Sequence, residues 1–200
     1  MAAQPVSQAV EAGFFLSFTF QHVVPAPRDE VWQWHTRPGA LIRLSAPFGP
    51  MTPIAQADSL ADGTSVLGLP GGLKWVARHD LTRFQPQRAF ADVCVSTPLR
   101  ALTQWRHEHR FADHPEGTLI TDDVDTRVPT RAVKGMFAYR QHQLIEDFRF
   151  TQRLGALNAR PLSIAITGSH GTVGQAVSAQ LRTLGHTCLL YTSPSPRDRQ

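Results

Sequence analysis

Apolar and polar residues alternate in short runs between residues 54 and 128, and this period of two predicts strands with one buried face. Paired turn residues separate several of the runs: Asp62-Gly63, Gly71-Gly72, Gln85-Pro86 and Glu116-Gly117. Because short turns join consecutive strands, we expect an antiparallel meander. The predicted strands are Ile54–Asp58, Ser65–Leu69, Leu73–Phe84, Ala89–Ser96, Leu102–Phe111 and Thr118–Val128.

The segment before the meander predicts one strand and two helices. Aromatic and β-branched residues from Phe18 to Val24 are typical of a strand, which two prolines then close. A helix is predicted from Arg28 to His35, since Asp29 and Glu30 favour the positive end of the helix dipole. A second, shorter helix is predicted at residues 40–44.

After the meander, apolar residues recur at helical spacing between Gly135 and Leu154, which predicts one long helix. A curved antiparallel sheet and a single long helix bury both of their apolar faces when the sheet wraps around the helix. Imperfect filling of the space between them leaves a cavity. The pattern therefore predicts an α+β domain at residues 14–155, in which an antiparallel sheet wraps around a long C-terminal helix.

A different pattern follows a predicted linker at residues 156–161. Residues 162–167 (LSIAIT) form a short apolar run of the kind that buried parallel strands show. A glycine-rich turn and a predicted helix at residues 172–184 come directly after it. This order is typical of the first strand and helix of a Rossmann-like α/β domain, which we assign to residues 162–187.

The glycine-rich turn carries the most specific motif of the chain, TGSHGTVG. Gly168 permits the tight turn out of the strand, Gly171 lets the backbone approach a pyrophosphate, and Gly174 permits close packing of the helix. An ordinary glycine-rich turn is the alternative. The motif predicts that NAD or NADP is bound in the untruncated parent protein, with weak or absent binding in this chain. The binding residues are Thr167, Gly168, Ser169, His170, Gly171, Thr172, Val173 and Gly174.

Residues 188–200 do not continue the expected domain, because the stretch from Thr192 is polar and interrupted by prolines. We expect residues 188–200 to be a non-native or disordered tail and the Rossmann-like domain to be truncated. The Tyr-x-x-x-Lys pair of short-chain dehydrogenases is also missing, since Gln143 stands four residues after Tyr139 and no lysine follows Lys134. No catalytic residue is therefore assigned, and this chain is expected to be inactive as a dehydrogenase.

Candidate ligand-binding residues lie on two of the predicted strands, where alternation places them on one face. Aromatic and histidine side chains on such a face suit a cavity wall with a few polar groups. The predicted cavity lining is Trp75, Ala77, His79, Trp105, His107, His109 and Phe111, together with helix side chains from residues 136–148.

The polar residues of the predicted strands allow three other interpretations. His107 and His109, two positions apart, form the beginning of a metal site, but no third ligand is identifiable and no metal is expected. Acid–base catalysis by the same two histidines is an alternative. Asp122, Asp123 and Asp125 lack the glycine and glutamate of a calcium loop, so they predict a solvated strand face.

Composition narrows the function classes further. The net charge is +4 and the pI about 9.7, but the arginines are scattered among acidic residues, so no nucleic-acid surface is expected. Cys94 and Cys188 form no CxxC pair, which favours a reducing cytoplasmic location. No apolar stretch reaches the length of a membrane span, and no basic residue precedes Arg28, as a secretory signal would require.

In their order along the chain, several segments resemble the START-like (SRPBCC, helix-grip) domain that precedes an atypical short-chain dehydrogenase domain in bacterial epimerase-family proteins. The resemblance covers residues 18–184, and one departure is Thr126, which stands where an aromatic residue is commoner. The segments that carry it are LKWVARH (73–79), FAD (90–92), WRHEHRF (105–111), DVDTRVP (123–129) and MFAYR (136–140).

The resemblance implies a module that binds a small hydrophobic or amphipathic ligand. It further implies that this module precedes an NAD(P)-dependent oxidoreductase or epimerase domain, its partner in the same chain, most of which is missing here. Two alternatives stay open: an enzyme like the polyketide cyclases and aromatases that uses the cavity histidines, and a non-catalytic regulatory or structural module.

Overall fold

The large sheet is the main architectural element of the protein. The computed structural model describes residues 10–12, 15–155 and 160–192. The strands of the sheet are β1 (Val10–Ala12), β2 (Phe15–Val24), β3 (Thr52–Ala55), β4 (Thr64–Gly68), β5 (Lys74–His79), β6 (Ala89–Cys94), β7 (Arg106–His114) and β8 (Gly117–Thr126). All neighbours pair antiparallel in the order β1-β2-β8-β7-β6-β5-β4-β3. This confirms the predicted antiparallel meander.

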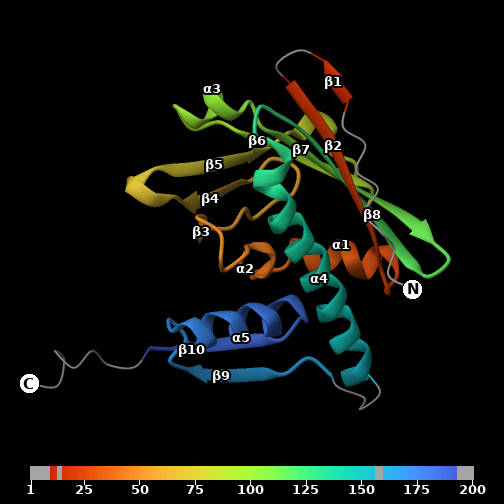
Figure 1. Cartoon of the computed structure of the whole chain (residues 1–200). Helices are drawn as coiled ribbons and strands as arrows, with labels where there is room; N and C mark the ends of the chain where they lie inside the picture. The colour runs from red at the N-terminus through yellow and green to blue at the C-terminus, as the bar shows by residue number, and fades with distance from the viewer. Residues whose placement is uncertain (1–9, 13–14, 156–159, 193–200) are drawn as a thin grey trace, which may run out of the picture.

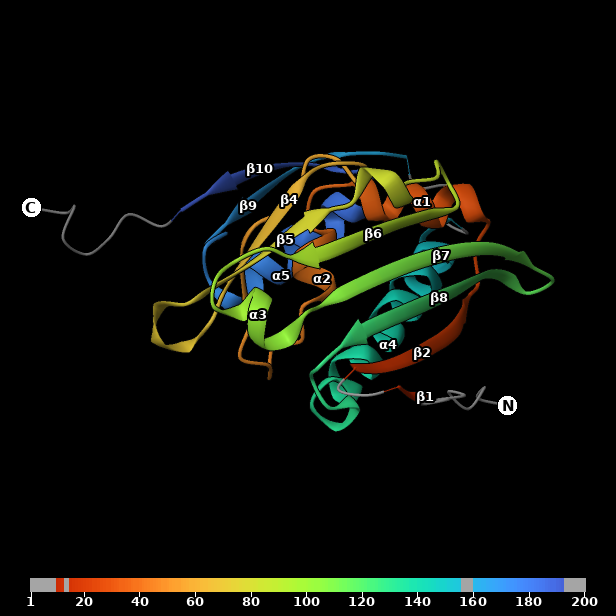
Figure 2. The same cartoon turned by 90° about the horizontal axis from the view of Figure 1, so that it is seen from above.

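One long helix lies against the inner face of this sheet, and Figures 1 and 2 show β2, β7 and β8 curving over it. The long helix is α4 (Thr130–Gly155), which confirms the predicted helix and begins five residues earlier than expected. The shorter helices of the same part are α1 (Arg28–Thr36), α2 (Ala40–Leu44) and α3 (Leu99–Thr103).

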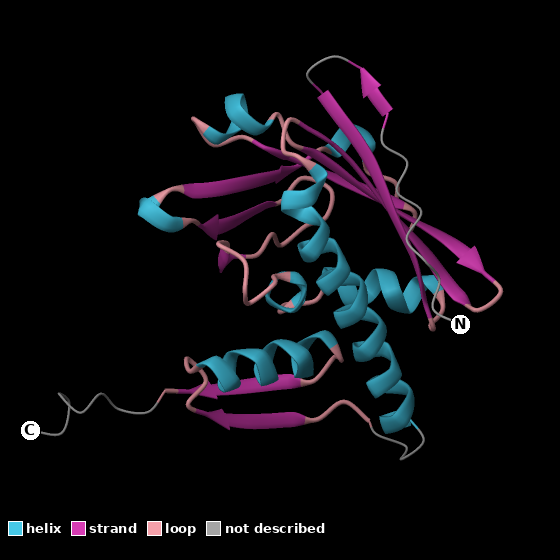
Figure 3. Ribbon diagram, in the orientation of Figure 1, coloured by secondary structure: helices cyan, strands magenta, loops and turns pink. Residues whose placement is uncertain are grey.

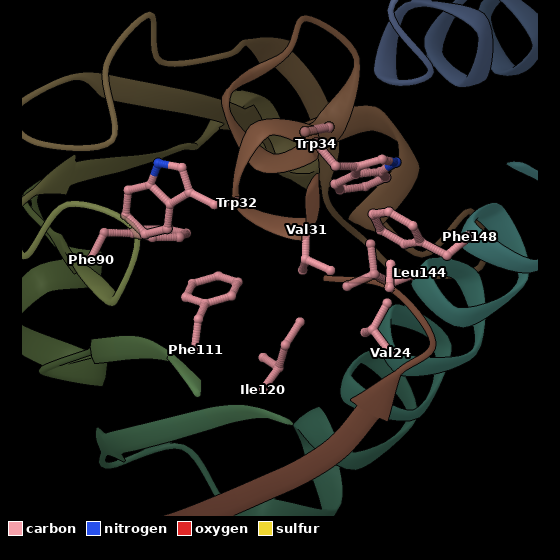
Figure 4. Packing of buried hydrophobic residues seen from close by; sticks show 11 residues of the cluster. Val24, Val31, Trp32, Trp34, Phe90, Phe111, Ile120, Leu144 and Phe148 are labelled. Carbon is pink, nitrogen blue, oxygen red and sulfur yellow. The ribbon is translucent and has the colours of Figure 1, made fainter. Parts of the chain in front are cut away.

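Aromatic and aliphatic side chains at helical spacing on α4 explain why the sheet closes over it. Phe137, Leu144 and Phe148 share one face of the helix and are at most 4% exposed. The Phe137 ring stacks on Phe20 of β2 at 4.4 Å. Leu144 and Phe148 pack with Val24 in a separate core cluster, which Figure 4 shows and which also contains Trp32 and Trp34. Burying each such side chain stabilises the fold by roughly 1.5–3 kcal/mol.

Three predicted strands have the wrong limits. The strand predicted at Ile54–Asp58 lies at Thr52–Ala55. The strand predicted from Leu102 begins at Arg106, because residues 99–103 form α3 and the Leu102 side chain is exposed. The strand predicted to continue to Phe84 ends at His79. Asp80 then caps a short 3-10 turn at Leu81–Arg83, since its carboxylate accepts a hydrogen bond from the backbone N–H of Thr82.

A second, smaller sheet follows α4, formed by β9 (Ser163–Thr167) and β10 (Thr187–Tyr191). The two strands are parallel and are connected by α5 (Thr172–Thr183). Residues 188–191 belong to this strand and are therefore not disordered, whereas the non-native origin of residues 188–200 stays a prediction. The apolar run TCLLY (187–191) is long enough to pair with β9. It was interpreted as part of a tail because the residues that follow it are polar and include prolines. Residues 156–159 of the linker and residues 193–200 lie outside the described residues.

The helix α5 lies between its own two strands and α2 of the larger domain (Figure 3). The guanidinium of Arg37 donates a hydrogen bond to the carbonyl oxygen of Thr183 at 2.8 Å. Gly39, at a φ of 99°, brings its backbone so close to α5 that a Cβ atom would stand 2.6 Å from the carbonyl oxygen of Ala179. This close approach requires glycine at position 39.

Among the described residues, neither α4 nor any shorter helix combines the length and the apolar character that crossing a bilayer requires.

Candidate functional site

A cavity of about 600 Å³ opens between strands β4 to β7, the α2 segment and the first turns of α4. Most of its wall is apolar, and six of the side chains that line it are Leu41, Leu44, Leu67, Trp75, Trp105 and Met136. Ligand pockets in proteins typically measure about 300–1,000 Å³ and combine apolar walls with a few polar groups. The cavity therefore has the size and lining of a site for a small apolar molecule.

Six of the seven side chains predicted to line the cavity do so: Trp75, Ala77, His79, Trp105, His107 and His109. Phe111 does not. It lies on the same face of β7, 3% exposed, but further along the strand, where its ring packs against Trp32 at 5.4 Å. Because α1 covers this end of the sheet, Phe111 belongs to the core and its assignment to the cavity is corrected.

The part of α4 that faces the cavity differs from the predicted 136–148. The lining residues of the helix are Arg131, Ala132, Val133, Gly135, Met136 and Arg140. Beyond Arg140, Leu144 and Phe148 pack against the core instead. The cavity thus lies at the N-terminal half of α4, whose earlier start at Thr130 was not predicted.

A cluster of two histidines and two aspartates lies on the inner face of three neighbouring strands. The strand register places Asp92 of β6 opposite His107 of β7, and Asp122 of β8 opposite His109 of β7. The two imidazole rings lie 3.9 Å apart between their centroids, and Phe90 stacks on His109 at 4.2 Å. Asp92, His107 and His109 all line the cavity.

The Asp122 carboxylate contacts the imidazole rings of both His107 and His109. Its Oδ1 atom lies 3.0 Å from His107 Nε2 and 2.8 Å from His109 Nδ1, so both ring N–H groups donate to one carboxylate oxygen. Burial alone would raise the pKa of Asp122, but the hydrogen bonds from His107 and His109 hold it well below its usual value. Asp122 is therefore an ionised buried carboxylate that fixes the orientation of both rings.

Burial lowers the pKa of His109 well below its ordinary value, and the neighbouring His107 lowers it further. His109 is consequently neutral near pH 7, with its hydrogen on Nδ1 towards Asp122. Its Nε2 atom then presents a lone pair, 4.0 Å from Asp92 Oδ2.

The places of Asp92 and Asp122 in this cluster were not predicted from the sequence. The prediction that Asp122 lies on a solvated face is wrong, since its side chain is 3% exposed. Strand alternation carried the missing signal, because Asp122 shares its face with Ile120 and Val124, both fully buried. Asp92 was part of the FAD segment that carries the family resemblance, but it had no predicted role, and its contact with His107 depends on the pairing of β6 with β7.

Two further histidines line the cavity with fixed ring orientations. His35 Nδ1 lies 2.7 Å from the carbonyl oxygen of Val31, and His79 Nδ1 lies 2.7 Å from that of Ser59. A carbonyl oxygen only accepts, so Nδ1 donates in both rings. Burial lowers the pKa of His35 to about 4, which keeps the ring neutral at pH 7.

The glycine motif forms the connection between β9 and α5. Gly168 has a φ of 64°, and Gly171 is the residue that precedes the first turn of α5. A Cβ atom on Gly174 would stand 2.2 Å from the carbonyl oxygen of Gly168, so the helix packs directly on the turn. Thr167 ends β9, and Ser169 is buried, its hydroxyl donating to the carbonyl oxygen of Tyr191. The three remaining motif residues are exposed: His170, Thr172 and Val173.

No protein-family model and no curated protein matches the chain. Among solved structures, the nucleoside-diphosphate sugar epimerase from Corynebacterium glutamicum is 53% identical over 91% of this chain, with a TM-score of 0.83. The matched part covers 41% of that protein, so this chain spans less than half of its length.

Other similar structures cover a smaller share of this chain at much lower identity. The AHSA1-like protein from Aeromonas hydrophila is 13% identical, covers 72% of this chain and 97% of its own, and has a TM-score of 0.50. A conserved protein of unknown function from Enterococcus faecalis is 11% identical, covers 70% and 75%, and has a TM-score of 0.51. At these identities the likeness concerns the fold alone. The chain therefore has a helix-grip fold that encloses a cavity, and over most of its length it is similar to part of a sugar epimerase.

Proposed function

We propose that the helix-grip part of the chain binds a small apolar or amphipathic molecule in the cavity between the sheet and α4. The observation that carries the proposal is a cavity of about 600 Å³ with a mainly apolar wall. Apolar surface removed from water contributes about 25 cal/mol per Å², so contact with this wall would supply most of the affinity. The histidines, Asp92 and Arg140 would orient the polar end of the ligand.

Tryptophan fluorescence offers a direct test, because the four tryptophans divide between the cavity and the core. Trp75 and Trp105 line the cavity, whereas Trp32 and Trp34 lie in the core cluster that contains Leu144 and Phe148. Titration with a fluorescent fatty acid or an aromatic polyketide-like probe is expected to quench Trp75 and Trp105 and to saturate at one equivalent.

A variant that fills the cavity makes the test specific. Leu67→Trp places a bulky ring in the cavity wall and is expected to abolish saturable binding. Leu102→Ala, at an exposed position on α3 outside the cavity, is the control and is expected to bind as the unchanged chain does. Saturable binding that survives Leu67→Trp in a folded protein would contradict the proposal.

We further propose that residues 162–187 begin an NAD(P)-binding domain of an oxidoreductase or epimerase. Three observations support this: the positive φ of Gly168, the contact of Gly174 with the turn, and parallel strands connected by α5. The first backbone N–H groups of a helix have no partner within it, so the start of α5 suits a phosphate group. The sugar epimerase similar to this chain is consistent with such a cofactor.

Saturation-transfer NMR with NADH and NADPH measures this binding on the chain itself, even at low affinity. We expect a signal from the adenosine and pyrophosphate-linked ribose protons that Gly171→Val removes, since a side chain there blocks the approach of a pyrophosphate. Gly155→Val, at the end of α4 with nothing within 4 Å of its Cβ position, is the control. A signal that Gly171→Val leaves unchanged would overturn this second proposal.

A further inference from the structure

Two histidine nitrogens and one carboxylate oxygen face one another in the wall of the cavity. His107 Nδ1 lies 3.6 Å from Asp92 Oδ2, and His109 Nε2 lies 4.0 Å from the same oxygen. All three ligand atoms lie within 4.8 Å of one another. The two histidine side chains are at most 5% exposed and that of Asp92 is 14% exposed, so the group is shielded from bulk solvent on all sides except the cavity.

Asp122 determines which nitrogen of each ring carries the hydrogen. An ionised carboxylate only accepts hydrogen bonds, so His107 Nε2 and His109 Nδ1, both within 3.0 Å of it, are the donors. The other two ring nitrogens, His107 Nδ1 and His109 Nε2, therefore face Asp92.

Three possible metal-ligand atoms thus converge in the cavity wall. The distances of 3.6 and 4.0 Å exceed those of hydrogen bonds. They leave space for a cation that binds the Asp92 carboxylate and both ring nitrogens. With metal–ligand bonds of about 2.0–2.2 Å, tetrahedral ligand atoms stand roughly 3.4 Å apart, which small side-chain rotations reach from the observed distances.

We propose that Asp92, His107 and His109 bind one divalent transition-metal ion, for which Zn²⁺ is the reference. Imidazole and carboxylate ligands suit Zn²⁺, and sites with three protein ligands leave a position for water or another oxygen ligand. Asp122 occupies the outer position of a carboxylate–histidine–metal arrangement for both histidines at once, which fixes their ring orientation.

The open coordination position faces the cavity. A ligand that carries a carboxylate, a hydroxyl or a carbonyl oxygen on an apolar body would therefore bind the metal with that oxygen. This inference goes beyond the proposed function, and metal binding is measured without any apolar ligand, so each can fail while the other holds.

Isothermal titration of the chelator-treated chain with Zn²⁺ tests the proposal. One equivalent of Zn²⁺ is expected to bind. Asp92→Asn is expected to lower the Zn²⁺ affinity at least about tenfold, and Asp122→Asn is expected to lower it about 10–100-fold. Glu108→Gln is the matched control, because Glu108 stands between the two histidines on β7 but points to the opposite face, where it pairs with Arg83 at 2.5 Å. This control is expected to bind Zn²⁺ as the unchanged chain does.

Cobalt provides a second measurement on the unchanged chain, which does not depend on a variant that folds. Co²⁺ bound as proposed is expected to give visible absorption of four- or five-coordinate cobalt, and two strongly shifted imidazole N–H signals in the NMR spectrum, one from each histidine. Absence of both signatures overturns the proposal. Zn²⁺ binding that is equally tight in Asp92→Asn also overturns it, because the ion would then be bound by other histidines.

Discussion

Arg43 of α2 and Asp147 of α4 form a two-pronged ion pair across the end of the cavity. The Nε atom of Arg43 donates to Oδ2 of Asp147 at 3.0 Å, and Nη2 donates to Oδ1. Gln143 donates to the same Oδ1 at 3.0 Å, and the Asp147 side chain is only 1% exposed. Because Leu41 and Leu44 of α2 line the cavity, this pair holds part of the cavity wall against α4.

Replacing Asp147 by alanine is expected to lower the free energy of unfolding by about 3–5 kcal/mol, since it leaves a mostly buried guanidinium without its partner. Urea unfolding followed by circular dichroism measures the change. Glu146→Ala, one position earlier, removes an exposed partner of Arg149 and is expected to leave the midpoint unchanged. Equal midpoints for the two variants would show that the ion pair does not stabilise the fold.

The stability of the fold is expected to fall as the pH is lowered from about 6.5 to 4, with His35 as one cause. Burial lowers the pKa of His35 to about 4 in the folded protein, against 6.5 in the unfolded chain. In this interval the unfolded chain binds a proton that the folded protein does not, so acid favours unfolding. A pKa difference of that size lowers the free energy of unfolding by about 3 kcal/mol. This loss is complete below pH 4 and absent above pH 7.

His35→Phe removes this titration and keeps an aromatic ring beside Phe111, which His35 meets edge-on at 5.0 Å. Urea midpoints at pH 7, 6 and 5 are expected to decline less steeply for His35→Phe than for the unchanged chain. Burial also lowers the pKa values of His22 and His109, so part of the decline is expected to remain. Parallel declines in the two proteins would exclude His35 as a cause.

The period of two along the strands was sufficient to predict which side chains share a face, but not which strands are neighbours. Alternation alone placed Trp105, His107 and His109 together. The same alternation applied to Ile120 and Val124 would have placed Asp122 inside, had the three aspartates not been interpreted as one solvated run. The approach of Asp92 to His107 depends on the register of two strands, and Phe111 leaves the cavity because α1 packs over it. Both effects are tertiary, so no local pattern predicts them.

His22 of β2 is the clearest case of a buried polar side chain that costs stability. Both of its ring nitrogens are buried, and neither has a hydrogen-bond partner among the described residues. Leaving such groups unpaired costs about 1–3 kcal/mol. We expect His22→Leu, which fills similar space on the same inner face as Phe20 and Val24, to raise the free energy of unfolding by about 1–2 kcal/mol. A lower urea midpoint would show instead that a polar partner satisfies His22.

Gly174 offers a test of how the small sheet depends on the packing of α5. A methyl group at this position would collide with the carbonyl oxygen of Gly168 and the backbone of Ser169, so Gly174→Ala must displace the turn. Overpacking of this kind costs about 1–3 kcal/mol. Faster hydrogen exchange is expected in β9, α5 and β10, with unchanged exchange in the large sheet.

Gly135→Ala is the matched control for that experiment. Gly135 lies inside α4, with no atom within 4 Å of its Cβ position, so alanine there adds helix propensity without a collision. It is expected to stabilise the fold by about 0.5–1 kcal/mol. Because it stabilises the fold, Gly135→Ala is expected to slow hydrogen exchange. If Gly174→Ala slowed exchange in the same way, the turn would accommodate a side chain, and the close contact between α5 and the glycine motif would not require glycine at position 174.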